Sequence, residues 1–235
     1  MKKSILLWMF AVLVGCTTPN LLLDGGFLAT ADYFPVTGRQ GWLINQRLGF
    51  ASFVTGKVDR DWDKTSTLEI GDFESVRQAG AYRFSFSDGV DNVAQLDCKS
   101  GEDSDQVNLR GVLGGDAKWI VDAESFLNCS LLEWGETVAW KLVMSANDEH
   151  LRGYLFSGKE AMPVYEVLGT DELEGSAWPV GKIVGYLVYR DGLQLAAIQV
   201  MNEGGVWIDS KLSPVERRRL ASLAAALLLY SPSES

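Results

Sequence analysis

Histidine and cysteine are scarce in this chain, and they are the side chains that most metal and nucleophile sites need. Among 235 residues there is one histidine, and the three cysteines are Cys16, Cys98 and Cys129. No CxxC or HxxxH spacing occurs, which argues against a zinc site. A G-x-S-x-G nucleophile elbow is missing, as are the Walker and dinucleotide-binding glycine patterns. We therefore expect no cofactor, no metal and no catalytic residue, and we favour a protein that is not an enzyme.

Positive charge is also in deficit. The chain carries 21 Lys and Arg against 31 Asp and Glu, which gives a net charge of −10. An acidic surface repels phosphate backbones, so we expect no nucleic acid among the partners. The one basic cluster is Arg217-Arg218-Arg219. Successive residues of a helix point in different directions, so we expect ion pairs with the acidic body there rather than a basic patch.

Long apolar runs are absent between the two ends of the chain, and the longest lies near the N-terminus. Residues 5–14 are apolar and follow Lys2 and Lys3. Such a segment is too short for a permanent membrane span and is typical of a secretory signal. It ends in Leu13-Val14-Gly15-Cys16, which resembles the lipobox of bacterial lipoproteins.

The resemblance to lipoproteins implies a maturation and a location. In that class the signal, here residues 1–15, is removed, and the cysteine, here Cys16, carries acyl chains such as palmitate. Several acyl chains on one cysteine anchor a protein stably, whereas one chain binds reversibly. The next residue is Thr17 and not Asp, which by resemblance to enterobacterial lipoproteins implies the outer membrane, facing the periplasm. The alternatives are a signal cleaved elsewhere and an uncleaved N-terminal anchor.

Cys98 and Cys129 are the remaining cysteines, and we expect them to form a disulfide. An even pair in an exported protein is typical of such a bond. It would close a loop of about 30 residues and stabilise the fold by roughly 3–4 kcal/mol in the chain-entropy model. The alternative is a pair of buried free thiols.

Short alternating segments predict the fold class α+β, β-dominated, with antiparallel sheets. Tyr82, Phe84 and Phe86 alternate with smaller or polar residues, and a Ser-Asp-Gly turn then leads to a partner strand at residues 93–98. A further strand is expected at residues 50–55, and a polar loop at residues 99–105. Residues 123–132 are ambiguous and are compatible with a helical turn.

The C-terminal part reads as a β-meander followed by a helix. Segments 183–189, 193–200 and 205–208 are joined by glycine-containing turns, which favours three antiparallel strands. Ser213-Pro214-Val215-Glu216 is a capping box with proline at the first helical position. The helix should run to about Leu229 and pack on the meander, because its second half is apolar nearly all round.

The domain organisation follows from these segments. After the signal, residues 16–41 are expected to form the lipidated N-terminus and tether, with part of this stretch packed on the body. Residues 42–148 form a β-rich domain, and residues 149–235 form the meander with its helix. One continuous domain is the alternative.

Two aromatic positions are candidates for a binding surface. Trp62 lies between Asp61 and Asp63, where paired carboxylates beside an aromatic ring are compatible with acid–base work on a sugar. The alternative is a strand or turn with ion-paired flanks. Trp178 lies in a Gly-, Ser- and Pro-containing loop, where an indole can face a glycan or a protein partner.

These observations favour a lipid-anchored envelope protein that does not catalyse a reaction but binds another envelope protein or assists an assembly. The alternatives are a glycan- or small-ligand-binding module and a carboxylate-dependent glycan hydrolase. A cleft between two facing carboxylates would indicate the hydrolase, and a groove with tryptophans at its floor would indicate the binding module.

Overall fold

The structure, a computed structural model, describes residues 19–39, 46–61, 78–104, 107–108, 118–119, 123–147, 150–158 and 162–230. Cys16, Trp62 and Asp63 lie outside these ranges. The elements are α1 (Gly25–Leu28), β1 (Ala31–Pro35), β2 (Gly49–Phe50), β3 (Phe53–Thr55), β4 (Asp59–Asp61), β5 (Gln78–Ser87), β6 (Asn92–Ser104), β7 (Val107–Asn108), β8 (Lys118–Trp119), β9 (Ala123–Glu133), β10 (Trp140–Asn147), β11 (His150–Phe156), β12 (Pro163–Thr170), β13 (Gly185–Arg190), β14 (Leu193–Gln199), β15 (Gly205–Asp209) and α2 (Pro214–Leu229).

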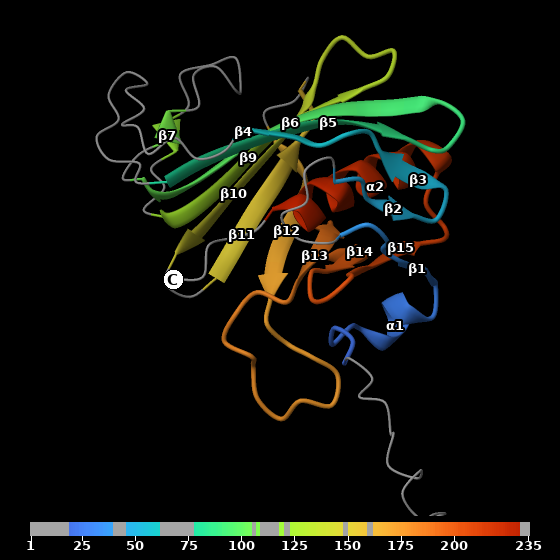
Figure 1. The fold of residues 1–235 in the computed structure, drawn as a ribbon. Coiled ribbons are helices and arrows are strands. Elements are labelled where there is room, and N and C mark those ends of the chain that lie inside the picture. The colour runs from blue at the N-terminus through green and yellow to red at the C-terminus, as the bar shows by residue number, and fades with distance from the viewer. Residues whose placement is uncertain are drawn as a thin grey trace, which may run out of the picture.

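Most of the described strands join one antiparallel sheet, in the order β1-β15-β14-β13-β12-β11-β10-β9-β6-β5-β3-β2, with β4 beside β5. The sheet is strongly curved and wraps around α2 (Figure 1). Its two edges meet where the backbone N–H groups of Thr37 and Gly49 donate to each other's carbonyl oxygens at 2.8 and 3.0 Å. The result is a nearly closed barrel, and the predicted meander forms β13 to β15 of its wall.

Alternation along β5 and β6 determines which side chains enter the barrel. Tyr82, Phe84 and Phe86 are buried on β5, as the period-2 pattern predicts. On β6, Leu96 and Cys98 face the same interior. Cys98 lies opposite Cys129 of β9, with Cα atoms 4.1 Å apart, and the two sulfurs are bonded. The predicted disulfide therefore joins neighbouring strands on the inner face.

Helix α2 has the predicted bounds and the predicted capping box. Ser213 Oγ accepts from the backbone N–H of Glu216, and the Glu216 carboxylate accepts from the backbone N–H of Ser213. The environment of the helix differs from the prediction, because α2 contacts β6 and β9 as well as β14 and β15 of the meander. A helix that is apolar nearly all round needs partners on every side, and the curved sheet supplies them. The buried residues are Leu220, Ala221, Ser222, Leu223, Ala224, Ala225, Ala226, Leu227, Leu228 and Leu229.

Two local predictions were wrong, and the structure assigns one segment that the sequence left ambiguous. The strand expected at residues 50–55 is a tight hairpin of β2 and β3, because Ala51 adopts a left-handed φ of 50°. The polar loop expected at residues 99–105 is mostly strand, since β6 continues to Ser104 while it pairs with β5 and β9. Backbone pairing on both sides there overrides the weak β-propensity of the sequence. The ambiguous segment at residues 123–132 belongs to β9.

The segment before β1 packs on the outer face of the meander. Leu21 and Phe27 are buried against Val184, Ala197 and Trp207. Strands β14 and β15 are therefore covered on both faces, by α2 inside and by this segment outside. Part of the stretch expected to be a tether is thus packed on the body.

The strands on either side of the position proposed as a domain boundary pair with each other in one sheet. Asn147 at the end of β10 is the register partner of His150 at the start of β11. The division into two domains itself stays a prediction. None of the helices in the described ranges combines the length and the apolar character needed to cross a bilayer.

Candidate functional site

The two ends of the barrel carry different chemistry. Because the strands are antiparallel, the turns β5–β6, β9–β10, β11–β12 and β13–β14 and the first turn of α2 lie at one end. Among the described residues, each of these five turns or its border carries an apolar side chain that is between 49% and 89% exposed. We call this set the rim, and it comprises Val90, Trp134, Met162, Leu193 and Val215.

Backbone geometry fixes the turns of the rim. In the β9–β10 turn, the N–H of Trp134 donates to the carbonyl of Val93 at 2.8 Å, and Gly135 takes a φ of 85°. In the β13–β14 turn, Asp191 and Gly192 both have positive φ, as a two-residue hairpin turn requires. The side chains that project from these turns are therefore held by an ordered backbone.

The β5–β6 turn is fixed by a carboxylate. Asp88 Oδ1 accepts from the backbone N–H groups of Asp91 at 2.9 Å and Val90 at 3.2 Å. These two donors lower the pKa of Asp88. Val90 is thereby held at the tip of the hairpin with its side chain exposed to solvent.

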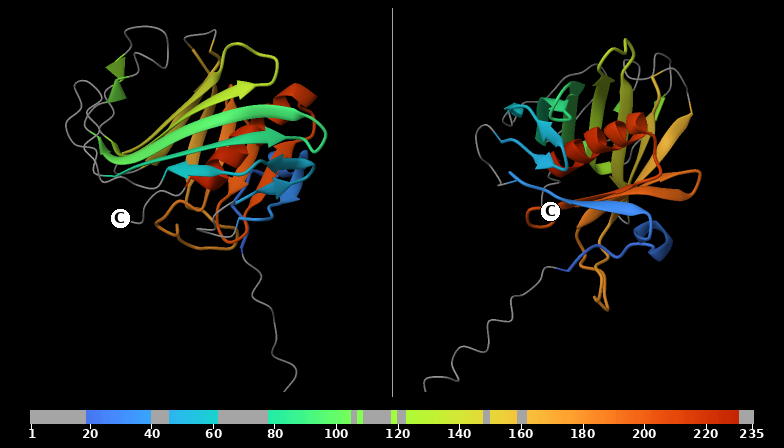
Figure 2. Two further views of the ribbon diagram at one scale, coloured as in Figure 1. Left: turned by 45° about the horizontal axis from the view of Figure 1, so that its top comes forward. Right: turned by 90° about the vertical axis from the view of Figure 1, so that its right-hand side faces the viewer.

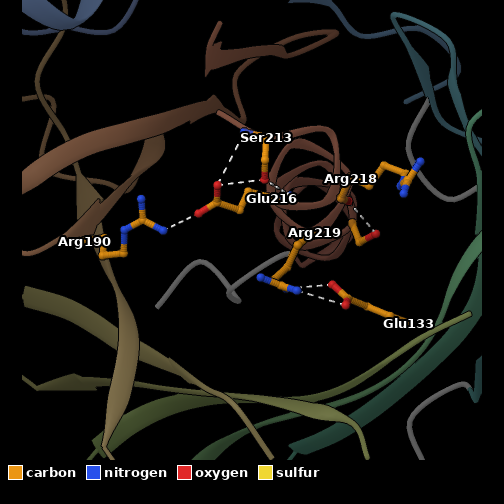
Figure 3. Close-up of polar contacts among 7 residues, drawn as sticks. Glu133, Arg190, Ser213, Glu216, Arg218 and Arg219 are labelled. Carbon is orange, nitrogen blue, oxygen red and sulfur yellow. Dashed lines mark hydrogen bonds and ion pairs between the residues drawn. The ribbon is translucent and has the colours of Figure 1, made fainter. Parts of the chain in front are cut away.

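The start of α2 is tied to the barrel wall beneath the rim (Figure 3). Arg190, at the end of β13, forms an ion pair with Glu216 in the first turn of the helix. Glu216 also accepts from Ser213 Oγ at 2.8 Å. Hydrogen bonds from Arg190 and then from Ser213 lower the pKa of Glu216. This network joins the capping box of the helix to the sheet.

A second ion pair holds the helix from the opposite wall. Arg219 Nε lies 2.6 Å from Glu133 Oε1, and its Nη2 donates to Oε2 at 3.0 Å. The side chains are only 13% and 15% exposed, and the guanidinium lies 3.9 Å from the centre of the Trp140 ring. Burial opposes the charge, but the hydrogen bonds that Arg219 donates to Glu133 outweigh it and raise the pKa of Arg219. Bidentate geometry makes this the best-defined polar contact at the rim.

The sequence predicted ion pairs at the three consecutive arginines rather than one basic patch, and the structure agrees. Arg217 donates to Asp32 at 2.9 Å, whereas Arg219 binds Glu133. Figure 3 shows Arg218 pointing away from Arg219. Arg217 and Arg219 therefore connect the helix to two different strands of the barrel, β1 and β9.

At its other end α2 meets side chains that sequence reasoning missed. The carbonyl oxygens of Leu228 and Leu229 accept from Arg39 Nε and Arg60 Nη2, each at 3.0 Å. The Tyr82 hydroxyl donates to the carbonyl of Ala226 at 2.9 Å. Positive charge at a helix C-terminus is favourable, and the two arginines donate to carbonyls in the last turn, where the helix lacks its own donors. The Ala226 carbonyl also accepts from the backbone N–H of Tyr230 at 3.0 Å. Arg60 thus serves the fold, although the pattern around it had suggested a sugar site.

The carboxylate candidate Asp61 lies on the outer surface. With Asp59, Arg83 and Asp97 it lines a hollow of about 30 Å³, in which Arg83 is 3.6 Å from Asp97. Such a volume holds a water molecule or two and is far below that of a small-molecule site. Its proposed partners Trp62 and Asp63 lie outside the described residues. Within the described ranges no group of His, Cys, Asp and Glu is suited to hold a metal ion.

Trp178 lies at the end of the barrel opposite the rim, in the loop of residues 171–184. Its side chain is 81% exposed, in keeping with the predicted surface position. The base of this loop pairs with the start of the described chain, because Leu21 forms a bridge with Leu173 and the N–H of Glu174 donates to the carbonyl of Asn20 at 2.8 Å. In Figure 1 the loop hangs below the barrel beside the beginning of the coloured chain. The structure thus does not bring Trp178 and Asp61 into one site.

Trp134 and the other rim residues were not among the sequence candidates. A signal for them does exist, since Val90, Trp134 and Leu193 each lie within two residues of a turn glycine. An apolar side chain in a turn has no strand face to pack on.

Comparison with family models, with curated proteins and with solved structures finds no match for this chain.

Proposed function

We propose that this chain is a lipid-anchored protein of the bacterial outer membrane that catalyses no reaction and binds another envelope protein through its rim. The observation that carries the proposal is the placement of five exposed apolar side chains on successive turns at one end of the barrel. The anchor is supported by the lipobox at Leu13-Val14-Gly15-Cys16.

Several properties of the rim suit protein binding. Single exposed apolar residues are ordinary, but a set of them gathered at one end of a molecule is typical of an interaction surface. Tryptophan is enriched among residues that contribute most to binding energy, and Trp134 is 75% exposed. The backbone N–H groups of Val90 and Trp134 are hydrogen-bonded, so little ordering entropy is lost in the β5–β6 and β9–β10 turns on association.

The ion pairs beneath the rim support the same function. Arg190–Glu216 and Arg219–Glu133 connect β13 and β9 to the first two turns of α2. Val215 is therefore held in place relative to the ends of β13 and β9, from which the turns to Leu193 and Trp134 begin. A partner would meet a surface of defined shape.

The alternatives receive less support from the geometry. A barrel that binds a small ligand keeps its interior open, whereas here α2 occupies the interior with apolar side chains. A glycan hydrolase needs two carboxylates facing a substrate cleft. The hollow beside Asp61 is too small for a sugar ring, and Asp97 in it is paired with Arg83.

The position of the rim relative to the proposed anchor also matters. Residues 20–22 lie against the loop of residues 171–184, at the opposite end of the barrel. A protein anchored through Cys16 would therefore present the rim away from the membrane that holds it, where a periplasmic or neighbouring membrane partner can reach it.

The test compares two double variants by quantitative crosslinking in intact envelopes. Trp134→Ser with Met162→Ser removes two rim side chains, and Leu22→Ser with Leu28→Ser removes two exposed apolar side chains elsewhere. We expect the wild type to give a stoichiometric protein adduct and the rim variant to lose it. Central aromatic contacts contribute about 2 kcal/mol or more, which corresponds to an affinity for the partner that is about 30-fold weaker. The control variant should retain it. Equal retention in both variants, with both folded, would contradict the proposal.

A further inference from the structure

We infer that the loop of residues 171–184 is a second contact with the lipid bilayer, in which Trp178 enters the interfacial region and sets the orientation of the barrel. This inference rests on the proposed anchoring through Cys16. The loop would add to the anchor and not replace it, because one indole and one valine are too little apolar surface for stable attachment.

Only a short length of chain separates the proposed anchor from the barrel. Leu21 is buried and bridged to Leu173, and the carbonyl of Pro19 accepts from Gln199 Nε2 at 3.4 Å. Three residue steps separate Cys16 from Pro19, and they reach at most about 10 Å when fully extended. A lipidated Cys16 would therefore hold this end of the barrel against the bilayer surface.

The tip of the loop is uncharged and carries exposed apolar side chains. Residues 175–181 read Gly-Ser-Ala-Trp-Pro-Val-Gly and carry no charge. Trp178 is 81% exposed and Val180 is 41% exposed, so both side chains are available to the bilayer. Tryptophan is enriched at membrane–water interfaces, where the ring is partly in apolar surroundings and the indole N–H remains hydrogen-bonded.

The charged residues of the loop define how deeply it can enter. Asp171, Glu172 and Glu174 precede the uncharged tip, next to the residues that pair with the N-terminal segment, and Lys182 follows it. Three carboxylates outnumber the one lysine, so anionic head groups offer the loop no net attraction and the contact is mainly apolar. Only the uncharged tip would enter the interface.

The loop and the start of the described chain lie at the same end of the barrel. Both views in Figure 2 show the loop and the beginning of the described chain leaving the same end of the molecule. Two contacts at one end, the lipid and the loop, restrict tilting more than a single flexible tether does. The rim at the other end would then point away from the bilayer.

Fluorescence quenching by lipids tests the inference with a matched control. Lipidated protein purified from membranes is reconstituted into phosphatidylcholine vesicles with and without bromine atoms on the acyl chains. Wild type is compared with Trp178→Phe and with Trp134→Phe, since Trp134 is similarly exposed but belongs to the rim. We expect the bromine-dependent quenching of the wild type to disappear in Trp178→Phe and to persist in Trp134→Phe. Equal quenching in wild type and Trp178→Phe would overturn the inference.

A flotation step before the fluorescence measurement separates the two proposals. Protein that fails to float with the vesicles would overturn the anchor, and with it the inference that rests on it. Protein that floats but shows no Trp178-dependent quenching would overturn the loop contact alone and leave the anchor standing.

Discussion

Glu133 is the single residue whose loss should destabilise the fold most among the polar contacts described. In Glu133→Ala the Arg219 guanidinium still contacts the Trp140 ring, but it has no carboxylate to pair with. Its side chain is only 13% exposed, so water cannot fully replace the lost partner. We expect the free energy of unfolding in urea to fall by about 3 kcal/mol, since removing one partner of a buried ion pair leaves the other charge uncompensated. The control is Glu133→Ala with Arg219→Met, which should recover part of the loss. A double variant no more stable than the single one would contradict this account.

Glu216 gives the fold a predictable response to acid. Its pKa is lowered in the folded protein, first by Arg190 and then by Ser213, so the pair stabilises above the ordinary glutamate pKa of about 4.3. That stabilisation is lost as the pH falls through the lowered folded pKa. At pH 7 the free energy of unfolding of the wild type should exceed that of Glu216→Gln by about 1 kcal/mol, a value reduced to allow for the partial exposure of the ion pair. Urea titrations from pH 7 to pH 3 should show the difference shrinking below about pH 4, and a constant difference would refute the assignment.

Sequence reasoning succeeds for residues whose partners are few. Cys98 could only pair with Cys129 once Cys16 is assigned to the lipid, and the structure joins them. Arg39 and Arg60 could not be assigned, because their acceptors are carbonyls of α2 more than 160 residues away. No local pattern encodes a contact at that separation.

Among the elements, α2 is the one that the fold depends on. Leu223 and Leu227 are almost completely buried inside the barrel. Replacing either by alanine should lower the free energy of unfolding by about 2–5 kcal/mol, from lost transfer energy and a cavity. Ser213→Ala should cost only about 1 kcal/mol, because one helix donor loses its cap. Thermal and urea unfolding of the three variants give the order, and the reverse order would show that α2 is not core.

The bounds of elements were more predictable than their surroundings. The capping box fixes the start of α2, and glycine-containing turns fix the hairpins of the meander, since both signals are local. The left-handed Ala51 that divides β2 from β3 has no such signal. Likewise, a helix that is apolar all round predicts burial, but only tertiary structure shows that the wall around it includes β6 and β9 as well as the meander.

For the whole molecule, the sequence supports the class of fold but not its closure. Alternating segments predict antiparallel strands, and the structure contains them in one sheet. Closure depends on the bridge between Thr37 and Gly49 and on the fit of α2 inside the curve. The rim and the loop of residues 171–184 become opposite ends only when the strands are ordered around the barrel. The sequence therefore offered Trp178 as an isolated candidate, and it did not predict the rim or its position at the opposite end.

For the whole molecule we propose one orientation, in which the loop of residues 171–184 faces the membrane and the rim faces a protein. Photoreactive benzoyl-phenylalanine placed at Trp134 and, separately, at Trp178 tests both ends in living cells. We predict one discrete protein adduct from position 134 and a lipid adduct from position 178, identified by mass spectrometry. Lipid adducts from position 134, or the same protein adduct from both positions, would contradict the account.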